Sequence, residues 1–510
     1  MRRREPPVAT QGQPEGAAAA LTAPTGPPRG HPWFTSGENH GVMRRTPTLL
    51  GLGLCVLFAT TAPADATARP AAPSAHHARE QHPAVRYGDA YSTKAPYEPR
   101  QDPGTYQSAP RGFRPVFTEN VSRHGSRAAS DGADGKLILR LWDRADEEHQ
   151  LTPLGAEFGP EVRALLTAME KVGYGNLSGR GERELRGTAV RMAQRLPQLF
   201  ATIVAEREPL DVVSSGQGRA VDSGTVFADA LVGTDPALKP LVGPAHTDRD
   251  LLYFHKSAGG AAYRDWLAHD QRLAHTLKGV ADQPATRAAA RRVLAKLFRP
   301  AFVRRVVDGE FASIGSDVDA ARAVYRLYAI APAMSAESPH GRGWHLERYL
   351  APRDADWFGY VEDAAEFYEK GPSFADSDIT YAMAGVLLDD FFRQVEAKRD
   401  GRNDRGAELR FTHAEEIIPL AALMGLPGST KAADPGQRYA WADNPWRGAS
   451  VAPMAANIQW DVFRRGDTYL VRMLYNEKET AFKAGCRPVA RGSRFYDLEE
   501  LERCFGRTSG

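Results

Sequence analysis

Two arginines and a histidine lie within five residues of one another in the stretch Arg-His-Gly-Ser-Arg, residues 123–127. The preceding residues, 113–122, have strand character, so this basic cluster follows a predicted strand. Two further basic residues are placed in the same way: Arg219 comes after Val-Val-Ser-Ser, and His413 comes after Leu-Arg-Phe-Thr. Because ligands of open α/β sheets bind beyond the carboxyl ends of the strands, we expect these side chains to meet in one pocket.

This combination of residue types suits the binding and cleavage of a phosphate ester. Guanidinium groups match phosphate oxygens and neutralise charge on the transferring group in the transition state. His124 can attack phosphorus, because imidazole is a good nucleophile at neutral pH and water can clear the labile phosphohistidine. Glu415, two residues after His413, is the nearest candidate to protonate the leaving oxygen. The predicted phosphate ligands are Arg123, Arg127, Arg219 and His413.

Each feature also has an ordinary structural interpretation. Residues 123–127 alone could be a solvated basic turn, and Glu415 opens a helix, where an acid favours the dipole in any case. Lys256 could meet the outer phosphates of a polyanion, although a single lysine is more often a surface charge. The Arg-Arg-Gly-Asp stretch at 464–467 is typical of a hairpin turn. The order and placement of the three basic clusters favour the phosphate site.

Several segments together resemble one family. The Arg-His-Gly-Ser-Arg stretch looks like the signature of the histidine phosphatase superfamily, and 412–416, Thr-His-Ala-Glu-Glu, resembles the His-Ala-Glu motif of its multiple inositol polyphosphate phosphatases. Residues 212–231 are similar to that family's second-arginine segment. Residues 453–463 and 471–479 resemble its C-terminal part, so that the likeness runs from about residue 111 to 505.

The resemblance implies an α/β domain with an inserted α-helical domain over the site. It also implies that His124 is the phosphate-accepting nucleophile, that Glu415 protonates the leaving oxygen, and that inositol polyphosphates such as phytate are substrates. Two positions depart from related patterns. Ala129 stands where a proline is common, and Ala414 stands where the acid phosphatase branch carries aspartate. The second departure fits the inositol polyphosphate branch.

The remaining pattern predicts the elements that hold the site. Thr152 and Pro153 have the residue types of a helix cap and first helical position. Residues 245–400 show almost only helical periodicity. Apolar alternation on either side of the Arg-Arg-Gly-Asp stretch predicts a hairpin. Further predicted elements are a helix within 177–200, a strand at 209–215, a strand at 409–414 with a helix after it, and the hairpin over 457–476.

This order predicts the fold class and the domains. Strand–helix units before and after a block of helices indicate an α/β sheet domain formed by residues 111–244 and 401–510. The helical block, 245–400, is then an inserted α-helical domain. Residues 69–110 are predicted to be an irregular segment, and residues 1–42, rich in Pro, Gly and Ala, a non-native or disordered extension.

The region that begins at Met43 predicts export. Two arginines precede an apolar run over residues 49–60, and Ala66-Thr67-Ala68 suits signal peptidase. Residues 43–68 are therefore a predicted signal peptide, cleaved near Ala68 to give a secreted, extracellular protein. The apolar run is too short to span a bilayer comfortably, so no stable membrane anchor is expected.

The charge balance restricts the possible partners. Of 65 Lys and Arg and 63 Asp and Glu, residues 1–68 hold six and four, which leaves 59 of each sign in the remainder. A neutral body argues against broad attraction to nucleic acid or membrane. No histidine, carboxylate or cysteine spacing predicts a metal site, and no cofactor is expected. The expected partner is a small phosphorylated substrate, and the oligomeric state stays open.

Two cysteines, Cys486 and Cys504, lie near the C-terminus. In an exported protein such a pair is typically a disulfide, and the alternative is two unpaired buried thiols. A bridge would stabilise the fold by about 3 kcal/mol at most. It would be a structural link and not part of the chemistry.

Rival functions use the same residues. A phosphoglycerate-type mutase shares the histidine chemistry, but export and the long helical insertion argue against it. A broad-specificity histidine acid phosphatase acting on sugar phosphates stays open. A secreted protein that binds phosphorylated ligands without turnover is disfavoured, because both histidines and an acid are present.

Overall fold

The computed structural model of the protein describes residues 87–507. The predicted extension 1–42, the predicted signal peptide 43–68 and the first part of the segment 69–110 lie outside these residues. Residues 87–110 form two short 3-10 helices, η2 (Tyr87–Lys94) and η3 (Pro103–Thr105), joined by extended chain. Within the described part of the chain, no helix has the length and apolar character needed to cross a membrane.

A mixed sheet carries the site. Its strand order is β3-β2-β4-β1-β5-β6-β7, and β8 pairs with β6. β1, β4 and β2 run parallel, whereas β5 to β8 are antiparallel to their neighbours. The carboxyl ends of β1, β4 and β2 therefore meet at one edge. The strands are β1 Arg114–Arg123, β2 Leu210–Ser214, β3 His246–Thr247, β4 Ala407–Thr412, β5 Asn457–Arg465, β6 Thr468–Tyr475, β7 Lys478–Thr480 and β8 Phe495–Asp497.

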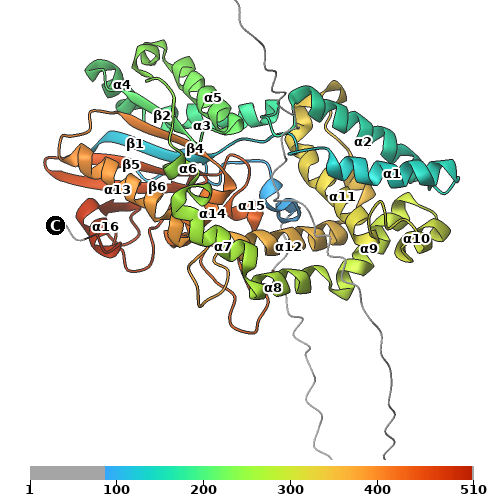
Figure 1. Ribbon diagram of the computed structural model, residues 1–510. Helices are drawn as coiled ribbons and strands as arrows, with labels where there is room; N and C mark the ends of the chain where they lie inside the picture. The colour runs from blue at the N-terminus through green and yellow to red at the C-terminus, as the bar shows by residue number, and fades with distance from the viewer. Residues whose placement is uncertain (1–86, 508–510) are drawn as a thin grey trace, which may run out of the picture. The chain divides into compact units, whose positions relative to one another are not determined.

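Helices cover both faces of this sheet, as Figure 1 shows. Alternation along a strand sends neighbouring side chains to opposite faces: Val212 packs with the α3, α4 and α5 cluster, and Val213 packs with the α13, α14 and α16 cluster. The helices are α3 Gly179–Arg195, α4 Pro197–Glu206 and α5 Gly218–Thr234 on one face, and α13 Gly385–Arg399, α14 Ala414–Leu423 and α16 Leu498–Cys504 on the other. The predicted fold class, an α/β sheet flanked by helices, is confirmed.

A second apolar core consists of helices alone. α1 and α2 pack against α9 and α11 in one buried cluster, and Figure 1 shows this group beside the end of the sheet. Between β3 and β4 the described chain forms helices and no strand. The exact domain boundaries remain a prediction. The remaining α-helices are α1 Ala133–Glu147, α2 Pro153–Val172, α6 Arg249–Leu252, α7 Ala261–His269, α8 Gln271–Ala281, α9 Pro284–Leu297, α10 Pro300–Val307, α11 Asp317–Ile330, α12 Pro352–Glu369 and α15 Gly448–Val451.

Most predicted local elements are present. The Thr152 hydroxyl caps α2 by accepting from the Gly155 amide at 2.8 Å, and β5 and β6 form the predicted hairpin. The helix predicted within 177–200 is present as α3, and a second helix, α4, follows it directly. α3 ends at Arg195 and α4 begins at Pro197, because proline lacks the N–H that a continuous helix requires and disfavours helical backbone in the preceding residue.

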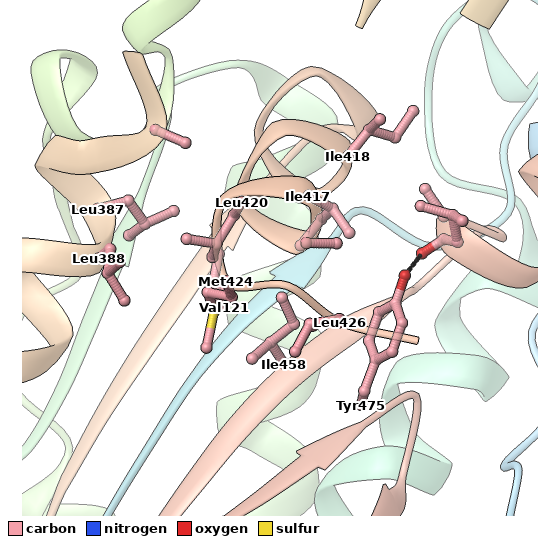
Figure 2. Packing of buried hydrophobic residues seen from close by; sticks show 14 of the residues in the cluster. Val121, Leu387, Leu388, Ile417, Ile418, Leu420, Met424, Leu426, Ile458 and Tyr475 are labelled. Atoms are coloured by element: carbon pink, nitrogen blue, oxygen red, sulfur yellow. Dashed lines mark hydrogen bonds between the residues drawn. The ribbon is translucent and has the colours of Figure 1, made fainter. Parts of the chain in front are cut away.

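The packing of α14 fixes the start of that helix over the sheet. Ile417 and Leu420 of α14 are fully buried, and Figure 2 shows them gathered with Val121 of β1 and Ile458 of β5. Burying a large aliphatic side chain contributes about 1.5–3 kcal/mol. This packing holds the first turn of α14 at the edge where β1 and β4 end.

The C-terminal segment adds elements that the sequence pattern did not indicate. β7 and β8 follow the hairpin and extend the antiparallel part of the sheet by pairing with β6, and the helix α16 follows β8. Cys486 and Cys504 form a disulfide with their Cα atoms 5.2 Å apart. The bond ties α16 to the loop before β8, as the cysteine count predicted.

Candidate active site

The predicted residues converge where the three parallel strands end. His124 directly follows β1 and His413 directly follows β4, and their rings lie 5.5 Å apart between centroids in an edge-to-face arrangement. The His124 amide donates to the Thr412 carbonyl at 2.9 Å, which continues the β1–β4 pairing to the site. Arg219 lies in the first turn of α5, beyond β2. Register between neighbouring strands thus brings together three segments that are distant in the chain.

His124 is held as a neutral imidazole. Its Nδ1 lies 2.9 Å from the Gly125 carbonyl oxygen. A carbonyl can only accept, so Nδ1 carries the proton and Nε2 keeps its lone pair. Burial, and next the positive charge of Arg123, lower the pKa of His124 well below its ordinary value. The imidazole therefore stays unprotonated in mildly acidic solution.

A buried carboxylate fixes the loop that carries these residues. Glu184 of α3 accepts from the Ser126 amide and the Ser126 hydroxyl, both at 2.8 Å. A side chain at position 125 would meet the backbone of Gly181, since an added Cβ would lie 2.6 Å from its carbonyl oxygen. Ala129, where a proline is common, accepts from the Gly175 amide at 2.7 Å. Hydrogen bonds and close packing thus hold the loop without that proline.

Three arginines of the site have no carboxylate partner among the described residues. Arg123 Nη1 donates to the Thr93 and Ala452 carbonyls, both at 2.6 Å. The buried Nε atoms of Arg123, Arg127 and Arg219 make no hydrogen bond within the described part of the chain. Burial is the first cause that lowers the pKa of Arg123 to about 10 and that of Arg127 to about 9, and the neighbouring arginines add to it. Cations in this arrangement are suited to an anion from outside.

His413 faces the same space. Its Nε2 is hydrogen-bonded to the Ser215 hydroxyl at 2.8 Å, and its buried Nδ1 makes no hydrogen bond with the described residues. Burial, and then Arg219, lower the pKa of His413 well below its ordinary value. The ring of Tyr253 packs against the His413 ring, with 5.2 Å between the ring centroids. His413 thus offers a positioned imidazole to a ligand.

Glu415 lies in the first turn of α14, next to His413, but it is not alone. Its Oε1 is 3.4 Å from the Nζ of Lys370, the residue after α12. Burial by itself would raise the pKa of Glu415, but Lys370 and the neighbouring histidines outweigh burial and hold this pKa well below its ordinary value. In the unliganded protein the carboxyl group is therefore ionised.

Several residues near the site were not predicted from the sequence. Lys370 ends an aromatic segment whose spacing indicates core, and its contact with Glu415 joins two distant segments. Lys94 on η2 is half-buried; burial, and then Arg127 and Arg123, lower its pKa to about 8 although Glu366 opposes this. Lys94 is a single lysine in the Pro-rich N-terminal segment, and no pattern in the sequence indicates that it lies near the site arginines.

A third histidine, His255, contacts Glu416, the residue after Glu415. His255 Nδ1 is 2.5 Å from Glu416 Oε1, and the Thr412 hydroxyl donates to Glu416 Oε2 at 2.9 Å. Both partners of this pair are buried. The pair links the 3-10 helix η5 (Phe254–Lys256) to the start of α14. In the sequence, only the pair Glu415-Glu416 after His413 hinted at this contact.

The other residues singled out in the sequence have ordinary places. Lys256 is half-buried on η5 and interacts electrostatically with Glu415. The Arg-Arg-Gly-Asp stretch forms the β5–β6 turn, with Gly466 at a positive φ of 59°. The aromatic residues Phe358, Phe367 and Tyr368 of α12 are buried in the core. Among residues 87–507, no group of three or more potential metal ligands is clustered.

Comparison with known proteins yields a consistent group of relatives. The model of the histidine phosphatase superfamily (branch 2) matches residues 117–476. The chain is similar to a multiple inositol polyphosphate phosphatase of Bifidobacterium longum, solved in complex with inositol hexasulfate and with phosphate. The two structures are 33% and 31% identical to it, cover 82% and 83% of this chain and 97% and 99% of their own, and give TM-scores of 0.76 and 0.78.

A curated relative extends the likeness to animals. Multiple inositol polyphosphate phosphatase 1 of Gallus gallus is 24% identical over 423 residues, which are 78% of this chain and 86% of the relative. The region matched by the family model, residues 117–476, includes both histidine segments and the block of helices between them.

Proposed function

Because the chain belongs to the histidine phosphatase superfamily (branch 2), we propose that it is a secreted phosphomonoesterase that hydrolyses inositol polyphosphates such as phytate. The observation that carries this proposal is the cluster of arginines without carboxylate partners around a neutral His124. The relatives' names agree, since the similar proteins of Bifidobacterium longum and Gallus gallus are multiple inositol polyphosphate phosphatases.

In the proposed mechanism, Nε2 of His124 attacks the phosphorus of the bound ester. The P–O bond to the inositol ring breaks as the P–N bond forms, and Glu415 gives a proton to the leaving oxygen. Water then attacks the phosphohistidine while the Glu415 carboxylate takes its proton, which releases phosphate and restores both groups. Arg123, Arg127 and Arg219 neutralise the three outer oxygens throughout, and His413 donates to one of them.

The further parts of the proposal concern domains and export. We assign residues 111–244 and 401–510 to the phosphatase domain and 245–400 to an inserted helical domain. Secretion rests on the apolar leader 43–68 and is supported by the Cys486–Cys504 disulfide. N-terminal sequencing of protein recovered from the culture medium should give a start near Arg69.

One assay separates the candidate functions. The purified protein is offered phytate, a sugar phosphate and p-nitrophenyl phosphate, and phosphate release is measured. We expect phytate to give the highest kcat/KM. A higher kcat/KM for the sugar phosphate would indicate a broad-specificity acid phosphatase. Binding of phytate without phosphate release would indicate a non-catalytic ligand-binding protein.

A further inference from the structure

A second set of charges lies beside the phosphate cluster. Lys370 Nζ is 2.8 Å from Glu366 Oε2 and 3.4 Å from Glu415 Oε1. Glu366 is four residues earlier, in the last turns of α12, whereas Glu415 belongs to α14. The longer of the two contacts is therefore the one that joins two elements, and it involves the proposed proton donor.

This contact opposes the role of Glu415. A general acid must carry its proton in the enzyme–substrate complex, but an ammonium group at this distance favours the ionised carboxylate. The side chain of Lys370 is 15% exposed and that of Glu415 is 33% exposed, so water screens the pair only partly. Glu415 can become an acid only if the influence of Lys370 is reduced when substrate binds.

We propose that Lys370 is a counter-ion that the substrate displaces: a phosphate group beside the scissile one draws Lys370 away from Glu415 and so allows Glu415 to take up a proton. A phosphate monoester carries about two negative charges and three strong acceptor oxygens, which compete well with one carboxylate oxygen at 3.4 Å. The proposal rests on the proposed function, because inositol polyphosphates have a phosphate on the ring carbon next to the leaving oxygen and monophosphate esters do not.

Glu366 makes this exchange possible without loss of the lysine. At 2.8 Å it keeps Lys370 at the C-terminal end of α12 while the longer contact opens. The proton that Glu415 then takes up comes from solvent, and it passes to the leaving oxygen in the first chemical step. A polyphosphorylated substrate thus prepares the acid that its own cleavage requires. Lys370 is a positioning residue in this scheme, since it acts through Glu415.

Other charged groups surround Glu415, and an experiment must distinguish their effect on its pKa from that of Lys370. Most of them face it with any phosphate ester bound, so they cannot distinguish a monophosphate from a polyphosphate. Lys256 is the exception, because it could also meet a second phosphate. The groups that act on Glu415 are His413 and Glu416 beside it, Tyr253, His255 and Lys256 around η5, Tyr263 on α7, Glu369 and Lys370 at the end of α12, and Arg123 and Arg127 beyond β1.

The test compares two esters with equally poor leaving groups. Phytate and glycerol 2-phosphate both release a secondary alcohol, but only phytate has neighbouring phosphates. The pH dependence of kcat reports ionisations in the enzyme–substrate complex. In the wild type, the decline of kcat at rising pH should begin at higher pH for phytate than for glycerol 2-phosphate.

Lys370→Met should remove this difference. Without the ammonium, kcat for glycerol 2-phosphate should persist to higher pH, by about tenfold at a fixed pH for each unit of pKa gained, while KM for phytate rises. Lys370→Arg keeps a positive charge and should retain the difference in pH limit between the two esters. Lys278→Met, which removes a comparable but exposed lysine paired with Asp282 on α8, should change neither profile.

Several outcomes would overturn the proposal. Equal pH limits for the two esters in the wild type would do so, as would a difference that persists in Lys370→Met or that vanishes instead in Lys256→Met. A Lys370→Met variant that loses rate on both esters with unchanged pH profiles would assign Lys370 a structural role only. If the wild type hydrolyses glycerol 2-phosphate but not phytate, the proposed function itself fails.

Discussion

Two groups of charged residues lie on the parallel strands β1 and β4 or just beyond them: Arg410 with its carboxylates, and the arginines of the site, which have none. In the middle of the sheet, Arg410 of β4 is fully buried and pairs with Glu119 at 2.9 Å and with Asp390 at 2.6 Å. At the strand ends, Arg123 is 4% exposed, and neither it nor Arg127 has a carboxylate partner among the described residues. Glu119 of β1 and Asp390 of α13 supply anions for the first group, and the second has no such partner among the described residues.

The ionisation of the two groups reflects this difference. Burial would lower the pKa of Arg410, but Glu119 and Asp390 outweigh it and raise that pKa. For Arg127, burial and the repulsion of Arg219 and Arg123 act in the same direction and lower the pKa to about 9. The first group stabilises the fold with charges that are already paired. The second is left for the charge of a ligand, and five predictions test this distinction.

The largest effect is expected at His124, the proposed nucleophile, which the unpaired arginines surround. His124→Ala leaves the cations in place but removes the attacking nitrogen, so kcat should fall on the order of 10⁴- to 10⁶-fold while phosphate still binds. His269→Ala, which alters an exposed histidine at the end of α7, is the matched control and should leave kcat unchanged. Near wild-type turnover of phytate by His124→Ala would exclude the mechanism.

Removing one arginine from each group should have different effects on stability. Arg410→Met leaves two buried carboxylates without their cation and should cost about 3–5 kcal/mol. Arg127→Met relieves repulsion, so its free energy of unfolding should equal or exceed that of the wild type while its activity falls. Urea unfolding without phosphate measures both variants. A comparable loss of stability in Arg127→Met would contradict the distinction between the groups.

Glu415→Gln tests the proton donor. It should slow phytate hydrolysis by roughly 10²-fold or more but scarcely affect p-nitrophenyl phosphate, whose leaving group departs as an anion. Activity on phytate should be greatest in mildly acidic solution: the lowered pKa of His124 keeps the nucleophile neutral there, whereas Glu415 must be protonated to donate. Equal losses on both esters would make Glu415 a structural acid at the helix start.

A bound anion should stabilise the folded protein through the site arginines, which lack carboxylate partners. It should not act through Arg410, which is already paired. Inorganic phosphate at a hundredfold excess over its Kd should add about 2.7 kcal/mol to the wild type, and less to Arg127→Met. Thermal unfolding across a phosphate series, with sulfate and chloride at matched ionic strength, measures the effect. Equal stabilisation of both proteins by phosphate would mean that it binds elsewhere.

The smallest expected effect is that of chelation. Histidine and arginines supply the nucleophile and the charge neutralisation that metal ions supply in other phosphatases, so EDTA should leave activity unchanged. The assay uses p-nitrophenyl phosphate, because calcium complexes phytate itself. Loss of activity that a divalent ion restores would count against the site.

How far the sequence could predict this structure depends on the range of the interactions. Thr152 and Pro153 start a helix through local capping, and the strand ends that carry His124 and His413 follow from patterns a few residues long. Lys370 and Lys94 could not be placed, because their positions depend on packing between distant segments. The break between α3 and α4 is also encoded locally, by Pro197. The ionised state of Glu415 likewise depends on Lys370, and therefore on tertiary structure.

The most direct test of the central claim is to trap the intermediate. Wild-type protein is mixed with radiolabelled substrate and quenched within the first turnover, and the chain is examined for bound phosphate. We predict a label that is stable in alkali and lost in acid, as expected of phosphohistidine, located on the peptide that contains His124 and absent from His124→Ala. Turnover without any such label, or a label that persists in His124→Ala, would contradict the claim.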